Sequence, residues 1–143
     1  MGRRTRLRLG AAGLCTVAVC LGMTWPAAAA GKYDGSAPMI CAVMSMVECT
    51  ADGKCERTAP QEGNNLPPFL RVDVKGGTLT ANDGSGRKTD IKASSVVGEQ
   101  LMLQGIDNGK AWNMVIGSGT GRWGGSVVED DGSFAIFGAC TLP

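Results

Sequence analysis

The sequence predicts a small all-β domain: an antiparallel meander of about eight or nine strands that closes into a barrel and is stapled by disulfide bonds. Turn dipeptides such as Asn108-Gly109 and Asp131-Gly132 supply the positive φ that tight hairpins need. Between the turns, apolar and polar residues alternate as they do in half-buried strands. No stretch of the mature chain has the period of an amphipathic helix.

The first half of the mature chain predicts five strands. Two of them flank the turn at 52–53, two flank the glycine pair at 76–77, and the fifth follows the turn at 83–84. In the third strand, Leu70 and Val72 share one face. We place these strands near 39–49, 54–59, 68–74, 78–82 and 87–92.

The second half predicts four more strands, because turn signals recur about every ten residues from Gly98 onward. Trp112, Met114 and Ile116 lie two residues apart and therefore line one face of their strand. We place these strands near 100–107, 111–117, 122–129 and 133–139. A sheet of this length would present open edges, and closure into a barrel removes them.

The first thirty residues have the composition of a secretory signal peptide. Four arginines lie within 3–8, a long apolar run follows, and a short alanine run ends at Ala30. This pattern predicts a signal peptide over 1–30 with cleavage after Ala30. The mature protein is then a single domain over 31–143, in which 31–38 forms a flexible lead-in. The export route stays open between the general secretory and the twin-arginine pathways.

The predicted mature domain is mildly acidic. Removal of 1–30 takes away four of the fourteen basic residues and none of the thirteen acidic ones, which leaves 10 − 13 = −3. Its cations are scattered singly, whereas nucleic-acid binding needs clustered positive charge. No later apolar run is long enough for a spanning helix. We expect a monomer with no nucleic-acid partner and no membrane span in its mature form.

Four cysteines remain after the signal peptide, and an exported chain keeps such cysteines oxidised. Four cysteines permit three pairings. Cys41 lies in the first expected strand and Cys140 directly after the last, while Cys49 and Cys55 flank a turn. Because bridged Cα atoms must lie within about 7 Å of one another, we favour a 41–140 and a 49–55 bond. The spacing lacks the two close pairs of a four-cysteine zinc site.

Several stretches of the mature chain resemble a family of small exported bacterial proteins of unknown function. The matching stretches cover most of 33–141: they are 33–36 leading to Cys41, the hairpin 48–55, and the segments 65–74, 101–117 and 137–140. The resemblance implies one exported, disulfide-containing β domain. It implies no activity and no catalytic residues.

The residue types of the chain argue against an ordinary enzyme. There is no histidine, which removes serine–histidine and cysteine–histidine catalysis and histidine-ligated metals. The acidic run 129–131 precedes a glycine and is typical of a solvated turn. The segment 82–86 lacks the spaced oxygen ligands of a calcium loop. We expect no catalytic residues, no cofactor and no metal.

Five residues are candidates for ligand binding. Arg71 and Asp73 alternate on one face of their strand, where they form either an exposed ion pair or polar contacts in a barrel lumen. Trp112, Arg122 and Trp123 lie near expected strand ends, where they either mark a barrel mouth or plug it.

These observations predict a non-enzymatic binding or interaction domain that is periplasmic or secreted. The first hypothesis is that the barrel mouth holds a small apolar molecule. The alternative is a protein–protein interaction module of the cell envelope, or an inhibitor of a secreted enzyme, which rests on architectural analogy. An enzyme that uses carboxylates alone ranks third.

Overall fold

The computed structural model describes residues 32–63 and 65–143, so the predicted signal peptide lies outside the described residues. The described part is all-β apart from one helical turn, α1 (Pro60–Gly63), and none of its helices is long and apolar enough to cross a membrane. The strands are β1 (Met39–Thr50), β2 (Cys55–Thr58), β3 (Phe69–Asp73), β4 (Thr78–Ala81), β5 (Lys88–Asp90), β6 (Ala93–Val97), β7 (Gln100–Asp107), β8 (Lys110–Gly117), β9 (Arg122–Val128) and β10 (Gly132–Thr141). The predicted fold class is confirmed.

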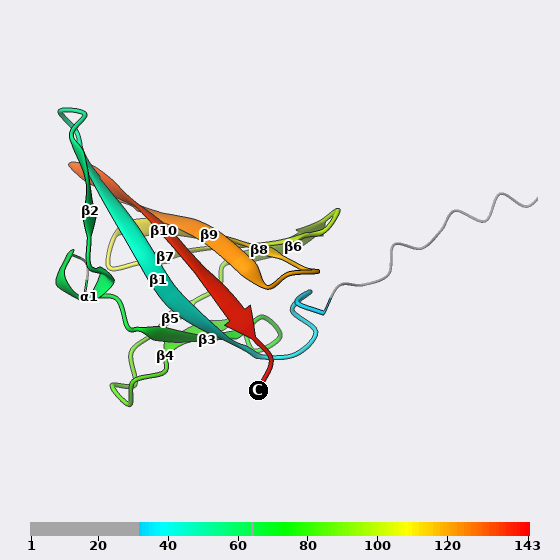
Figure 1. Cartoon of the computed structure of the whole chain (residues 1–143). Helices are drawn as coiled ribbons and strands as arrows, with labels where there is room; N and C mark the ends of the chain where they lie inside the picture. Colours follow the sequence, from blue (N-terminus) through cyan, green and yellow to red (C-terminus); the bar gives the residue numbers. More distant parts are fainter. Residues whose placement is uncertain (1–31, 64) are drawn as a thin grey trace, which may run out of the picture.

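The strands form one antiparallel sheet that curls into a half-barrel (Figure 1). Their order is β5-β4-β3-β1-β10-β9-β8-β7-β6, and β2 pairs additionally with β1. The first and last strands therefore lie side by side, with Ile40 opposite Thr141 at one end and Thr50 opposite Gly132 at the other. The pairing brings the lead-in and the C-terminus to the same end of the molecule (Figure 1).

The two outermost strands of this order, β5 and β6, are consecutive in the sequence and are separated by only Ile91 and Lys92. The Ile91 amide donates to the carbonyl of Gly77, directly before β4, over 2.8 Å. The next amide, that of Lys92, donates instead to the carbonyl of Gln104 on β7, also over 2.8 Å. One continuous segment thus leaves β4 and joins β7, which draws the two ends of the sheet together.

The strand β6 was not among the expected elements. Its residues are all exposed, and its sequence, ASSVV, has no alternation that a strand prediction can use. It forms because its backbone pairs with β7 over five residues, from Ala93 opposite Gln104 to Val97 opposite Gln100. The helical turn α1 was likewise not expected, since four residues are too few to show a helical period; Pro60 at its first position suits a helix start.

Two disulfide bonds hold the sheet, and both pairings are those favoured from the sequence. Cys41 and Cys140 are directly opposed on β1 and β10, with an S–S distance of 2.08 Å. Cys49 and Cys55 are opposed on β1 and β2, with an S–S distance of 2.05 Å. Because reducing compartments keep thiols free, the two bonds indicate an oxidising, non-cytoplasmic environment.

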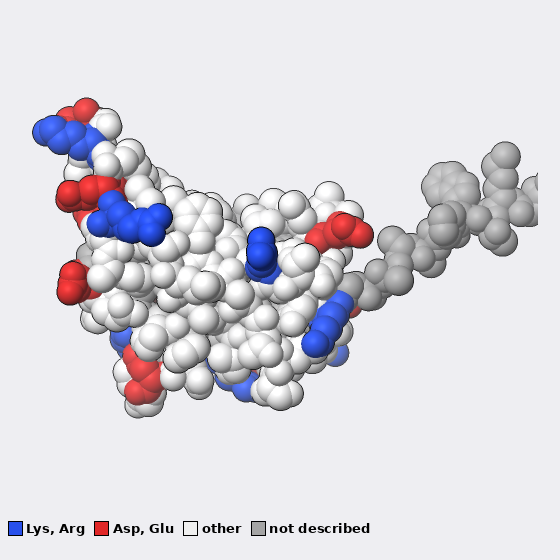
Figure 2. Space-filling model, in the orientation of Figure 1, with Lys and Arg blue, Asp and Glu red and all other residues white. Residues whose placement is uncertain are grey.

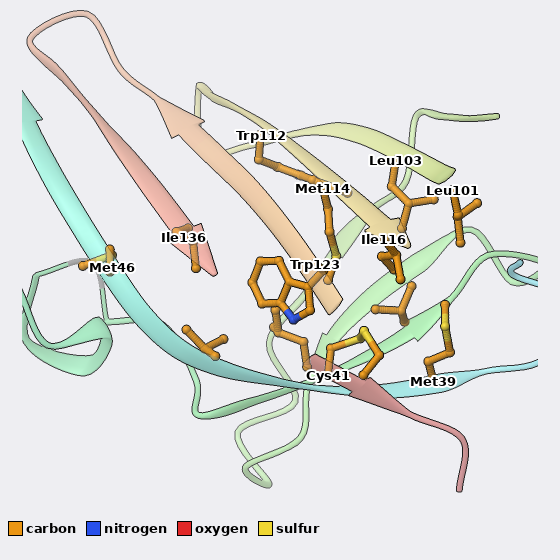
Figure 3. Packing of buried hydrophobic residues seen from close by; sticks show 14 of the residues in the cluster. Met39, Cys41, Met46, Leu101, Leu103, Trp112, Met114, Ile116, Trp123 and Ile136 are labelled. Atoms are coloured by element: carbon orange, nitrogen blue, oxygen red, sulfur yellow. A yellow bond between two sulfur atoms is a disulfide. The ribbon is translucent and has the colours of Figure 1, made fainter. Parts of the chain in front are cut away.

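One end of the half-barrel is tightly packed. Met39, Val72, Leu103 and Ile116 have no exposed surface, and Leu101 is 1% exposed. Figure 3 shows Met39, Leu101, Leu103 and Ile116 gathered beside the disulfide that contains Cys41. The predicted inward face of 111–117 is confirmed, since Ile116 packs in the core together with Trp112 and Met114.

Trp123 reaches across the sheet to the backbone of β1. Its Nε1–H donates to the Ala42 carbonyl over 3.1 Å. The indole passes over Gly138, its partner on β10, where a Cβ would collide with both the indole and the Ala42 carbonyl. The chain therefore needs a residue without a side chain at position 138.

The lead-in is anchored where the sequence predicts a flexible segment over 31–38; Gly31 itself lies outside the described residues. The Tyr33 amide donates to the Ser118 carbonyl over 2.9 Å, and the Tyr33 side chain packs against the core. Gly121 leaves room for the Tyr33 ring, because a Cβ there would lie 2.9 Å from it. The sequence does not reveal this anchor, because a single aromatic contact leaves no periodic pattern in a polar, glycine-rich stretch.

Candidate functional site

A cavity of about 400 Å³ opens on the inner side of the curled sheet. Its apolar walls come from β1, β3, β8, β9 and β10, through Val43, Leu70, Met114, Trp123 and Ile136. Figure 3 shows Met114, Trp123 and Ile136 directed from their strands toward this interior. The volume falls in the range of small-molecule sites, roughly 300 to 1,000 Å³.

An inward position of β9 beside the cavity has no side chain. Trp123 and Val127 face the interior, so Gly125 between them faces it too. Gly125 is opposite Met114 on β8 and Ile136 on β10, both of which belong to the cavity wall. A Cβ at this position would collide with the Asn113 carbonyl, so the close approach of β8 requires a glycine here.

Trp112 forms another part of the wall and carries an unsatisfied polar group. Its indole lies across Gly105 of β7, where a Cβ would collide with the ring. Trp112 is 9% exposed, and its Nε1–H is buried without a hydrogen-bond partner in the described part of the chain. An unpaired buried donor costs about 1–3 kcal/mol. An acceptor that a ligand brought to this N–H would offset that cost.

The mouth of the cavity is polar. Asn65 and Arg87 line one side, and the β7–β8 hairpin lines the other through Asp107 and Lys110. Lys110 Nζ lies 2.6 Å from Glu129 Oε1, and the two side chains are 37% and 23% exposed. The walls are therefore apolar and the opening is charged, which is the usual arrangement of a site that binds and orients a small molecule.

Arg87 is held in place at the mouth by three hydrogen bonds. Nη1 donates to the Asn65 carbonyl over 2.8 Å. Nη2 donates to Asp83 Oδ2 over 3.2 Å, and Nε donates to Ser85 Oγ over 3.3 Å. A guanidinium has five N–H donors, so two remain for another acceptor. Arg87 is thus a cation of fixed orientation that keeps two N–H donors for a further acceptor.

Asp83 is expected to titrate at a pKa of about 2, below its ordinary value of 3.8, because hydrogen bonds from Ser85 favour the carboxylate most and Arg87 adds to them. A lowered pKa means that the interactions of Asp83 stabilise the fold above pH 3.8 and are lost as the pH falls through about 2. The measurement is the carbon chemical shift of the Asp83 carboxyl group against pH. Ser85→Ala and Arg87→Gln should each raise this pKa; a pKa that neither change moves would contradict these causes.

The structure brings two of the five predicted binding residues to the cavity, Trp112 and Trp123. Arg71 does not line it, because it lies on the outer face between the buried Leu70 and Val72. Asp73 shares that outer face and serves a turn: its Oδ1 accepts the Gly76 amide over 2.8 Å. No ion pair joins Arg71 to Asp73 in the described part of the chain.

Arg122 is exposed and lies outside the cavity. The glycine-rich loop before it lies at the packed end of the core. Ser118 in this loop is 4% exposed, and the loop contacts Tyr33 of the lead-in. The sequence leaves open whether residues at a strand end mark a mouth or plug it, because both ends of a meander carry turns.

The acidic run 129–131 forms the β9–β10 turn, where Glu129 pairs with Lys110 and the Asp131 carbonyl accepts the Ala51 amide. Within residues 32–63 and 65–143, no group of three or more cysteine and acidic side chains is placed to hold a metal ion.

The outer face of β1, β10 and β9 forms a second distinctive surface. Figure 2 shows an expanse of uncharged residues over these strands, with most charged side chains at its margins. Large apolar side chains are exposed on the outer side of the sheet, including Met44 at 69%, Phe137 at 51% and Phe69 at 46%. An apolar surface of this kind is typical of a contact with another macromolecule.

Sequence reasoning missed Arg87 and Gly125. Arg87 stands just after a turn, where an arginine is ordinary, and its position at the mouth depends on β5 meeting β4 and on the segment that contains Asn65. Gly125 belongs to a Gly-Gly pair that resembles a turn signal, although it lies within β9. Comparison of the chain with protein-family models, with curated proteins and with solved structures finds no match.

Proposed function

We propose that this protein is a non-enzymatic binding protein that holds a small, largely apolar molecule in the cavity of its half-barrel. The observation that carries the proposal is a cavity of about 400 Å³ with apolar walls, next to an end of the same core that is fully packed. Side chains fill the interior of the half-barrel at one end, and the cavity lies at the other end.

The chemistry of the lining favours binding over catalysis. The chain has no histidine, and the cavity wall offers aromatic, aliphatic and thioether groups. Among the described residues that line the cavity, Asp107 is the single carboxylate, so no second one is present there to form a catalytic pair. Methionine and tryptophan side chains adapt to apolar ligands of varied shape.

The proposed location is the periplasm or the exterior of the cell. The two disulfides support an oxidising compartment, and the arginine-rich and apolar pattern of 1–30 supports export. Membership in a family of small exported bacterial proteins is part of the same proposal.

Filling the cavity should abolish binding without unfolding the protein. Ala81 lines the cavity from β4, so Ala81→Phe would place a ring in the space. We expect decan-1-ol to bind the wild type and to bind Ala81→Phe at least about tenfold more weakly, a loss of about 1.4 kcal/mol. Isothermal titration calorimetry gives the affinities, and the fluorescence of Trp112 and Trp123 reports on the cavity itself.

The matched control is Ala111→Phe, at an exposed position of β8 that does not line the cavity. It should bind decan-1-ol as the wild type does. Failure of decan-1-ol and of other apolar probes to bind the folded wild type would overturn the proposal, as would equal binding by the two variants.

A second candidate function is an interaction module for another exported protein, including an inhibitor of a secreted enzyme. The uncharged outer face with Met44, Phe69 and Phe137 supports it. A wild type that binds no small apolar probe would favour this second function over the first.

A further inference from the structure

We propose that the molecule held in the cavity is an amphipathic anion, with an apolar body against Trp123 and Met114 and a carboxylate or similar group at Arg87. This inference rests on the proposed function and names the chemical class of its ligand. It is carried by the fixed position of the Arg87 side chain at the cavity and by the donors that its hydrogen bonds leave unused.

Cations outnumber carboxylates around the cavity. Among the described residues that line it, Arg87, Lys88 and Lys110 are basic and Asp107 is acidic. The predicted mature domain has the opposite balance, with 14 − 4 = 10 basic and 13 acidic residues. Arg87 and Lys110 are each paired with a carboxylate outside this lining, Asp83 and Glu129, so the unused donors of Arg87, and not a net charge, favour an anion.

The cations at the mouth differ in how they are engaged. Lys110 is paired with Glu129 at 2.6 Å and Arg87 with Asp83 at 3.2 Å, so the Arg87 pair is the looser of the two. Lys88 lies in β5 opposite Thr80, on the other side of that strand from Thr89, which is opposite the core residue Leu79. Its side chain therefore leaves β5 on the side away from Leu79. Arg87 is the cation best placed to meet a ligand in the cavity.

The guanidinium of Arg87 is oriented before any ligand binds. Its bonds join it to Asp83 and Ser85 of the β4–β5 turn and to Asn65 before β3, and they use three of its five donors. The two remaining N–H groups suit a carboxylate, which accepts from a planar guanidinium in two parallel bonds. Because the Arg87 side chain is already ordered, its conformational entropy falls less when a ligand binds to it.

The three probes that test this inference share one alkyl chain and differ in their polar end: decanoate, decan-1-ol and decylammonium. We expect decanoate to bind the full-length mature protein about tenfold more tightly than decan-1-ol, and decylammonium to bind most weakly. Arg87→Gln should weaken decanoate about tenfold and leave decan-1-ol unchanged. Added salt should weaken decanoate selectively.

Arg122→Gln is the matched control, because it removes the same charge from an exposed position outside the cavity. It should not change the binding of any probe. If all three probes bind equally well, or if Arg87→Gln weakens decanoate and decan-1-ol alike, the inference is overturned while the proposed function stands. If no probe binds, the proposed function itself fails.

Discussion

A variant in which both Cys41 and Cys140 are replaced by alanine is expected to unfold with a free energy about 4–5 kcal/mol lower than that of the wild type. The bond closes a loop between residues 99 positions apart, so it removes many conformations from the unfolded chain. It also joins the two strands at the centre of the sheet, β1 and β10. Urea denaturation followed by tryptophan fluorescence gives the difference.

The control is the corresponding variant of Cys49 and Cys55, whose bond spans only six positions. In the loop-entropy model this smaller ring contributes about 2 kcal/mol. The two variants should therefore differ by about 2 kcal/mol or more. If they lose equal stability, loop length does not determine what these bonds contribute.

Gly138→Ala is expected to lower the free energy of unfolding by about 3 kcal/mol, which is large for the addition of one methyl group. The new Cβ would collide with the Ala42 carbonyl and with the Trp123 indole. Neither can give way easily, because the first is backbone within a sheet and the second donates its Nε1–H to that same carbonyl. Denaturant unfolding measures the loss, and near-ultraviolet circular dichroism reports on the Trp123 environment.

Gly119→Ala is the matched substitution, since a Cβ at that position would have no neighbour within 4 Å. It should leave stability within about 0.5 kcal/mol of the wild type, as surface changes usually do. A large loss at position 119, or a small one at position 138, would contradict the steric account.

The fold was accessible from the sequence wherever a local rule applied. Asn108-Gly109 predicts a hairpin turn, and both residues have positive φ, 49° and 82°, as a type I′ turn requires. The alternation around Leu70 and Val72 predicts a buried face, and both residues are buried. The cysteine spacing predicts two disulfide pairings, and both are present. The segment 93–97 was missed because it is held by backbone pairing with β7 and buries none of its side chains.

The candidate site was harder to predict from the sequence than the fold, because it depends on which inner positions of the sheet lack a large side chain. Trp112 and Trp123 attract notice as tryptophans near strand ends, and both line the cavity. The opening is also lined by residues far apart in the sequence, such as Asn65, Arg87 and Asp107, which only the curl of the sheet brings together. None of these residue types signals a cavity on its own.

The central position of β1 has a consequence for the order in which this chain acquires its structure. β1 is the earliest strand in the described part, yet it pairs with β10 over nearly its whole length, with Cys41 next to Cys140. The contact order of that pairing is high, and folding rates fall as contact order rises. As synthesis proceeds, β1 must wait for β10 to be made before it gains its main neighbour, so the sheet cannot be completed while only the first half of the domain exists.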